Sequence, residues 1–161
     1  MIDLFARMLA RPEAVISEAG PRDAAALAPL HAASFGRGWS EDEFERLLIE
    51  KNIIAHRAVI GRTLAGFVLS RLASGEAEIL SIAVAASRRR RGLARKLLDL
   101  HLRRLAGLGA TAVFLEVDEG NAAARRLYAR AGFRDVGRRP AYYRREAGAA
   151  AGAMVLRRDL A

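Results

Sequence analysis

The 161-residue sequence contains no cysteine at all. The chain therefore has no disulfide framework, no thiolate metal site and no cysteine nucleophile. Its three histidines, His31, His56 and His101, are too dispersed to show metal-ligand spacing, so we expect no metal. Aromatic residues make up only 6% of the chain, which argues against a surface that stacks bases. We therefore expect no direct sequence-specific binding of nucleic acid.

Long apolar runs are also missing. Although 52% of the residues are hydrophobic, no segment approaches the ~20 apolar residues that span a membrane. Residues 1–14 lack the basic-then-apolar order of a secretory signal. We therefore expect a cytoplasmic protein without membrane contact, folded as a single domain over residues 1–161. Within it, residues 1–12 are expected to be a flexible N-terminal extension.

The net charge of +9 comes almost entirely from arginine, because Lys51 and Lys96 are the only lysines. One interpretation is a compositional preference for arginine on a solvated surface. The other is attraction to an anionic ligand, or to an anionic assembly such as a ribosome. Composition alone leaves both interpretations open.

The hydrophobic periodicity predicts an α+β fold. A capping box from Ser40 to Glu43 marks one helix start. Helices are predicted over 21–35, 41–50, 93–108 and 122–131. Strands are predicted over 14–19, 53–60, 64–73, 76–84, 111–117, 133–137 and 153–158, the last after a flexible segment over 146–152. This order predicts a mixed, mostly antiparallel central sheet with a βαβ unit in its middle.

An arginine-rich turn lies between the strand over 76–84 and the helix that follows it. It runs from Arg88 to Arg91 and is followed by Gly92. Such a turn presents unpaired backbone N–H groups, and the positive end of the helix dipole adds to them. These features are typical of a phosphate or pyrophosphate site. The simpler alternative is a solvated, arginine-rich start of a helix.

Three polar residues further along the chain are candidates for chemistry. Glu116 lies near the end of an apolar strand, where it is either an exposed strand-end residue or a general base facing a cleft. Asn121 suits the N-cap of the next helix. Tyr128 is seven positions later on the same helix face, either as a core aromatic or as a proton donor to a leaving thiolate.

Together these motifs resemble the GCN5-related N-acetyltransferases (GNAT). The Arg-x-x-Gly-x-Ala form at 89–94 matches that family's acetyl-CoA signature, Gln/Arg-x-x-Gly-x-Gly/Ala. Further matches are Ile82-Ala83-Val84, Leu115-Glu116-Val117, Asn121-Ala122-Ala123-Ala124, Leu127-Tyr128 and Gly132-Phe133. Within the superfamily the chain looks most like the RimI type, the ribosomal-protein-alanine N-acetyltransferases. The stretches that favour this type are Trp39-Ser40-Glu41, Glu76-Ala77-Glu78-Ile79-Leu80 and Arg138-Arg139-Pro140-Ala141-Tyr142-Tyr143.

The resemblance implies a GNAT fold with six to seven strands that splay in the middle, about four helices, and acetyl-CoA in the gap. It assigns Glu116 as the general base and Tyr128 as the general acid. For acetyl-CoA it implies the backbone of Ile82, Ala83 and Val84, the turn residues Arg89, Arg90, Arg91, Gly92, Leu93, Ala94 and Arg95, and the side chain of Asn121. Trp39, Tyr142 and Tyr143 would shape a peptide cleft.

The implied activity is direct transfer of acetyl from acetyl-CoA to the N-terminal alanine amine of a small-subunit ribosomal protein. One alternative within the family is a small amine, or another protein N-terminus, as acceptor. An alternative from a different class is a non-catalytic basic module that binds CoA or the ribosome. The joint presence of Glu116, Asn121 and Tyr128 argues against that module, because binding alone needs none of them.

Overall fold

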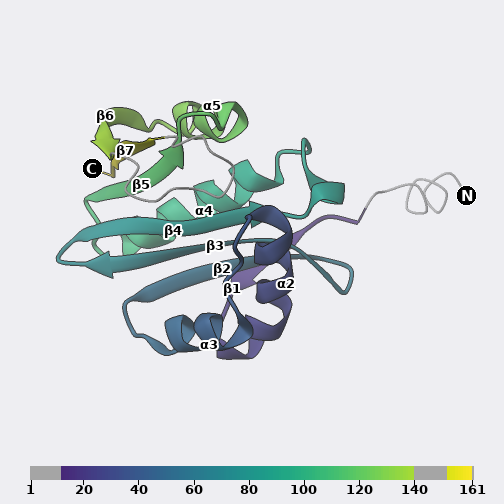
Figure 1. Cartoon of the computed structure of the whole chain (residues 1–161). Coiled ribbons are helices and arrows are strands. Elements are labelled where there is room, and N and C mark those ends of the chain that lie inside the picture. The colour runs from purple at the N-terminus through teal and green to yellow at the C-terminus, as the bar shows by residue number, and fades with distance from the viewer. Residues whose placement is uncertain (1–11, 140–151, 161) are drawn as a thin grey trace, which may run out of the picture.

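A single mixed sheet forms the centre of the protein (Figure 1). The computed structural model describes residues 12–139 and 152–160. The strands are β1 (Val15–Glu18), β2 (Ile53–Ile60), β3 (Thr63–Ala73), β4 (Glu76–Val84), β5 (Ala112–Asp118), β6 (Arg134–Arg139) and β7 (Ala153–Asp159). They are arranged in the order β1-β2-β3-β4-β5-β7-β6, and every pair of neighbours is antiparallel except β4 and β5.

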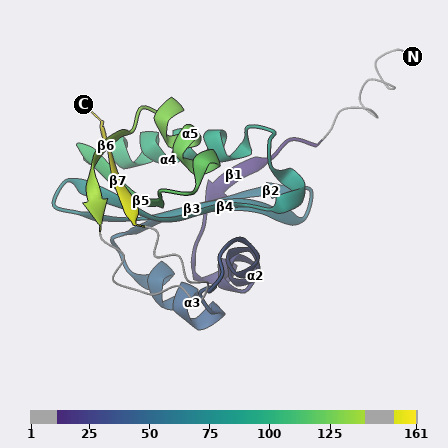
Figure 2. The same ribbon diagram turned by 45° about the horizontal axis from the view of Figure 1, so that its top comes forward.

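Helices cover both faces of this sheet. They are α2 (Ala24–Ser34), α3 (Glu41–Ile49), α4 (Leu93–Gly107) and α5 (Ala122–Arg130), with 3-10 turns η1 (Pro21–Asp23) and η2 (Ala86–Arg88). Figure 2 shows α2 and α3 on one face, and α4 and α5 on the other. The predicted α+β fold with four helices is therefore confirmed. No helix in the described residues is long and apolar enough to cross a membrane.

Local sequence signals explain several of these boundaries. The capping box predicted before α3 is present, because Ser40 Oγ accepts a hydrogen bond from the Glu43 amide at 3.1 Å. In return, Glu43 Oε2 accepts one from the Ser40 amide at 2.6 Å. The helix predicted from residue 21 begins as the η1 turn and becomes α-helical at Ala24. Pro21 occupies the first position of that turn, where a missing N–H costs nothing.

Each face of the sheet has its own hydrophobic core. On one face, α4 packs on β2, β3 and β4, and Leu97 and Leu105 of α4 and Val113 of β5 are completely buried. On the other face, Phe44 of α3 packs edge-on against Phe67 of β3, with ring centroids 5.7 Å apart. Aromatic pairs of this geometry add to the free energy of burial. The two cores place β3 and β4 between the helix layers.

The parallel pair β4 and β5 separates halfway along its length. The two strands pair only from Glu76 with Ala112 to Ile79 with Leu115. Beyond that point β5 stays paired with β7, and β4 stays paired with β3. A β-bulge accompanies the separation, since Leu80 is the extra residue between the pairs Ser70–Ile79 and Leu69–Ser81. The expected splay in the middle of the sheet is therefore present.

A buried polar network crosses the core beneath α4. The Nδ1 atoms of His56 and His101 share a hydrogen bond at 2.7 Å. The Nε2 atom of His101 and Ser70 Oγ share another at 2.6 Å. Burial, and then the neighbouring His56, lower the pKa of His101 to about 3. Both rings are therefore neutral at pH 7, and the hydrogen bonds satisfy their buried polar atoms.

Candidate active site

The turn between β4 and α4 is tightly coiled. Arg90 and Gly92 both adopt the left-handed region, with φ of 63° and 77°. Gly92 is the N-cap of α4 and offers no side-chain cap. The first intrahelical bond is from the Lys96 amide to the Gly92 carbonyl at 3.1 Å. The amides at 93–95 precede it and have no acceptor within the described residues, so this turn can bind an anion.

The arginines of the turn divide into two groups. Arg89 is folded back, and its Nε donates a hydrogen bond to the Val84 carbonyl at 3.0 Å. Arg95 pairs with Asp99 at 2.9 Å, one helical turn later. Arg90 and Arg91 are exposed, and no ion pair with a described residue is found for either. Arg90 and Arg91 are therefore available to a phosphate, as is Arg88, which likewise makes no ion pair with a described residue, whereas Arg89 fixes the end of β4.

The last residues of β4 present an open backbone edge. Ile82, Ala83 and Val84 pair with β3 on one side. On the side of β5, no described strand pairs with β4 beyond Ile79. An extended ligand with its own amide groups can hydrogen-bond to such an edge as an added strand. The three residues whose backbone is predicted to bind acetyl-CoA therefore lie at a suitable edge, next to the open amides of α4.

Ser81 is a polar residue of this edge for which the sequence analysis predicted no role. Its Oγ is buried and has no hydrogen-bond partner among the described residues. Ala83, two positions later, packs in the core beneath α2 and α3, so alternation directs the Ser81 side chain to that same face. An unsatisfied buried hydroxyl costs free energy until a partner arrives. This hydroxyl, with the open β4 edge, fits a ligand that carries amide or carbonyl groups in the splay.

Glu116 lies on β5, one residue after the last pair between β4 and β5. Its neighbours Leu115 and Val117 pack in the core on the α4 face. Because side chains alternate along a strand, Glu116 points to the opposite face. There it is exposed, and its Oε1 accepts a hydrogen bond from Arg139 Nη1 at 2.7 Å. The sequence analysis gave Arg139 no role, because no local signal relates two residues 23 positions apart.

Tyr128 is on α5, in the core on the α4 face. Only 6% of the residue is exposed, and its ring packs edge-on against Phe133 with centroids 5.7 Å apart. Burial raises the pKa of the Tyr128 phenol to about 12. Glu116 and Tyr128 are therefore held on opposite faces of the sheet. The phenol keeps its proton throughout the physiological pH range.

Asn121 is the N-cap of α5, as its residue type predicted. Its Oδ1 accepts a hydrogen bond from the Ala124 amide at 3.1 Å. The Asn121 side chain is exposed, so its Nδ2 group can still donate to a ligand. The capping role and a role in binding a cofactor arm are therefore compatible.

Trp39, predicted for a peptide cleft, stacks on His31 with ring centroids 4.4 Å apart. Its backbone amide also donates to His31 Nδ1 at 2.9 Å. Trp39 packs against the core that contains Ala83 of β4, and it lines a hollow of about 230 Å³ along α3. Tyr142 and Tyr143, the other two residues predicted for this cleft, lie outside the described residues.

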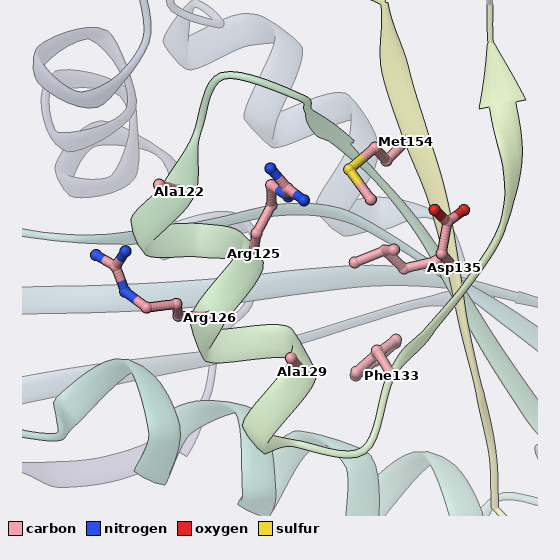
Figure 3. Close-up of a pocket in the computed structure, with 8 residues that line it drawn as sticks. Ala122, Arg125, Arg126, Ala129, Phe133, Asp135 and Met154 are labelled. Carbon is pink, nitrogen blue, oxygen red and sulfur yellow. The ribbon is translucent and has the colours of Figure 1, made fainter.

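A second hollow, of about 410 Å³, lies between α5 and the strands β6 and β7 (Figure 3). One face of α5 forms its wall, with Arg125 and Arg126 at the rim and Phe133 and Met154 on the opposite side (Figure 3). None of the residues predicted for the site lines it. Tyr128 occupies a different face of the same helix, so we place the candidate site at the splay of β4 and β5.

Comparison with protein families identifies residues 24–133 with the Acetyltransferase (GNAT) family. Comparison with curated protein sequences gave no match. The structure is similar to that of the ribosomal-protein-S18-alanine N-acetyltransferase from Escherichia coli. The TM-score is 0.85 and the sequence identity 26%, over 92% of this chain and 95% of that one.

Two further structures show the same fold at lower identity. One is Arabidopsis thaliana NAA60 in complex with a bisubstrate analogue, with a TM-score of 0.82 and 22% identity over 91% of this chain and 98% of that one. The other is Ard1 from Thermoplasma volcanium, with a TM-score of 0.81 and 24% identity over 92% of this chain and 98% of that one.

Proposed function

Because the chain belongs to the GNAT family of acetyltransferases, we propose that it acetylates the N-terminal alanine of a small-subunit ribosomal protein in the cytoplasm. The observation that carries the proposal is the open edge of β4 beside the unpaired amides of α4, with Glu116 and Tyr128 on the two faces of the sheet. The similarity to the Escherichia coli S18-alanine acetyltransferase supports the choice of acceptor.

Acetyl-CoA supplies an activated acetyl group as a thioester. We assign its binding to three parts of the site. The backbone of Ile82 to Val84 would pair with the pantetheine amides. The amides of Leu93, Ala94 and Arg95 would hold the pyrophosphate, with Arg90 and Arg91 adding positive charge. Asn121 would donate from Nδ2 to the pantetheine arm.

The chemistry assigned to the chain begins with the acceptor amine. An N-terminal amine has a pKa near 8, so it is largely protonated at pH 7 and cannot attack. Glu116, directly or through water, takes a proton from it. The nitrogen then forms a bond to the acetyl carbonyl carbon, and the carbon–sulfur bond breaks. Tyr128 gives its proton to the departing thiolate. The second proton that the nitrogen loses as the amide forms passes to water, and water returns a proton to the Tyr128 phenolate, so the products are the acetylated amine and CoA.

The electrostatics of the site fix the protonation state of the proton donor, although the raised pKa also makes this phenol a weaker acid than a free one. Tyr128 is protonated at every physiological pH because burial raises its pKa to about 12. A carbonyl that develops negative charge during attack is stabilised by backbone N–H groups. The unpaired edge of β4 offers such groups next to the bulge at Leu80. General acid and base steps of this kind contribute about 10²–10⁴-fold each.

The proposal is tested with synthetic peptides. One peptide carries the N-terminal sequence of the ribosomal protein with a free alanine amine, and its control carries the same sequence with that amine blocked. We expect acetyl transfer from acetyl-CoA to the free amine only, detected by mass spectrometry. Binding of acetyl-CoA with transfer only to a small amine would refute the assigned acceptor. Binding without transfer to any amine would favour the non-catalytic module.

A further inference from the structure

Arg139 contacts the carboxylate that we assign as the general base. It is the last residue of β6, and its Nη1 lies 2.7 Å from Glu116 Oε1. The two side chains remain accessible, with 62% of Arg139 and 36% of Glu116 exposed. The other carboxylate oxygen, Oε2, has no partner among the described residues. One oxygen is therefore tied to a guanidinium while the other can accept a proton.

The sheet register brings this pair together. Glu116 pairs with Val155 of β7, and Arg139 pairs with Ala153 of the same strand. Arg139 therefore lies diagonally across β7 from Glu116, within reach of a long side chain. Arg157, further along β7, places its guanidinium 5.1 Å from the centre of the Phe114 ring, on the face to which Glu116 also points. The contact joins three strands on the face opposite α4 and α5.

We propose that Arg139 is a positioning residue that weakens the attraction of Glu116 for the ammonium form of the acceptor, so that the amine gives up its proton and attacks in its neutral form. This inference rests on the proposed function and deepens it. A lone carboxylate would bind the acceptor as its ammonium ion and would stabilise that unreactive form. A carboxylate that is already paired with a guanidinium attracts an ammonium ion only weakly, because the two charges of the pair nearly cancel. Its Oε2 can still accept a hydrogen bond from a neutral amine and then the proton itself.

Other charged groups near Glu116 have partners of their own. On β6, Arg138 pairs with Asp135 and with Glu119, both at 2.6 Å. On β7, Arg157 pairs with Asp159 at 2.9 Å.

Two further acidic groups lie on β5 itself and on the neighbouring strand β4. Asp118, two positions along β5, accepts a hydrogen bond from the Gly120 amide at 2.8 Å. On β4, Glu78 is in register with Phe114, and it is exposed. Both acids favour the ammonium form of a nearby amine. They therefore increase the need for a cation beside Glu116.

The test compares Arg139→Gln with the wild type across pH 6 to 9.5, using the alanine peptide and saturating acetyl-CoA. Exposed ion pairs contribute modestly, so we expect kcat at pH 7 to fall about two- to fivefold. The peptide KM is expected to hold or fall, because the ammonium form binds better. The midpoint of the rise in kcat with pH is expected to move up by about half a unit, with full activity restored at high pH.

Three matched variants separate this role from a structural one. Arg139→Lys keeps the charge and should restore the wild-type profile. Arg138→Gln removes the neighbouring arginine, which does not contact Glu116, and should leave the profile unchanged. In a Glu116→Gln background, Arg139→Gln should cause no further shift of the midpoint.

The measurements distinguish a failure of the proposed function from a failure of the role assigned to Arg139. A wild-type enzyme that transfers acetyl to no peptide amine overturns the proposed function, and this inference with it. An active wild type with an unshifted Arg139→Gln midpoint overturns the inference alone. An equal loss of kcat at every pH, or a raised peptide KM, also overturns it, because either result indicates a structural role.

Discussion

Gly66 is the position at which one added methyl group should damage both stability and cofactor binding. It lies on β3, paired with Val84 of β4. A Cβ at this position would lie 2.9 Å from the Ala83 carbonyl oxygen and 2.9 Å from Leu97 Cδ1. It would also lie 3.3 Å from Val84 Cγ2. Leu97 can change rotamer, but a backbone carbonyl yields only if the strands move apart.

The expected cost follows from these contacts. Adding a methyl group to a close-packed core costs about 1–3 kcal/mol of unfolding free energy. Gly66→Ala should therefore lower the urea midpoint with little change in the m-value. The displaced residues, Ala83 and Val84, belong to the edge that we assign to pantetheine. We expect the affinity for acetyl-CoA, measured by calorimetry, to fall about tenfold, which corresponds to about 1.4 kcal/mol.

Gly107→Ala is the matched control. Gly107 is the last residue of α4, and a Cβ there meets no atom within 4 Å. Alanine is a better helix former than glycine, so stability should stay constant or rise by up to about 1 kcal/mol. Affinity for acetyl-CoA should not change. Wild-type stability and affinity in Gly66→Ala would refute the assignment of the β4 edge as a close-packed binding element.

Arg89→Ala removes the hydrogen bond to the Val84 carbonyl at the end of β4. Steady-state kinetics should therefore show a larger rise in the KM for acetyl-CoA than fall in kcat. A KM and a kcat that change by the same factor would contradict this. The neutral state of His101 predicts acid sensitivity. Its folded pKa of about 3 lies below the unfolded value of 6.5, so stability is full above pH 6.5. It should fall by about 1.4 kcal/mol per pH unit below that, and equal urea midpoints at pH 7 and pH 5 would refute this prediction. Since Tyr128 has a pKa of about 12, the pH–rate profile should show no fall in kcat/KM below pH 10. A fall in kcat/KM with a midpoint near pH 9 would argue against Tyr128 as the proton donor.

The sequence predicted most of the fold because its local signals were strong and mutually consistent. The helix at 93–107 repeats leucines on one face, and the capping box at Ser40 specified the start of α3. The boundaries of β2 and β4 match the prediction residue for residue, because turn residues border each of these strands. The cap at Asn121 followed from its residue type alone.

The environment of the catalytic candidates was not predictable in the same way. Whether Glu116 is buried or exposed depends on which strand lies beside β5, and the neighbour is β7 from the end of the chain. The contact with Arg139 depends on the same long-range order. Similarly, the Ser81 hydroxyl is buried without a hydrogen-bond partner among the described residues, and β4 separates from β5 beyond Ile79, neither of which a local pattern encodes. Tertiary pairing, rather than periodicity, decides these features.

The most direct test of the central claim measures acetyl transfer and acetyl-CoA binding together in Glu116→Gln and Tyr128→Phe. Both substitutions keep the size of the side chain and remove the acid–base function. We expect each to lower kcat for the alanine peptide by about 10²–10⁴-fold, while the Kd for acetyl-CoA from calorimetry stays within about twofold of wild type. Wild-type turnover in either variant, with acetyl-CoA still bound, would contradict the assignment of that residue to the transfer reaction.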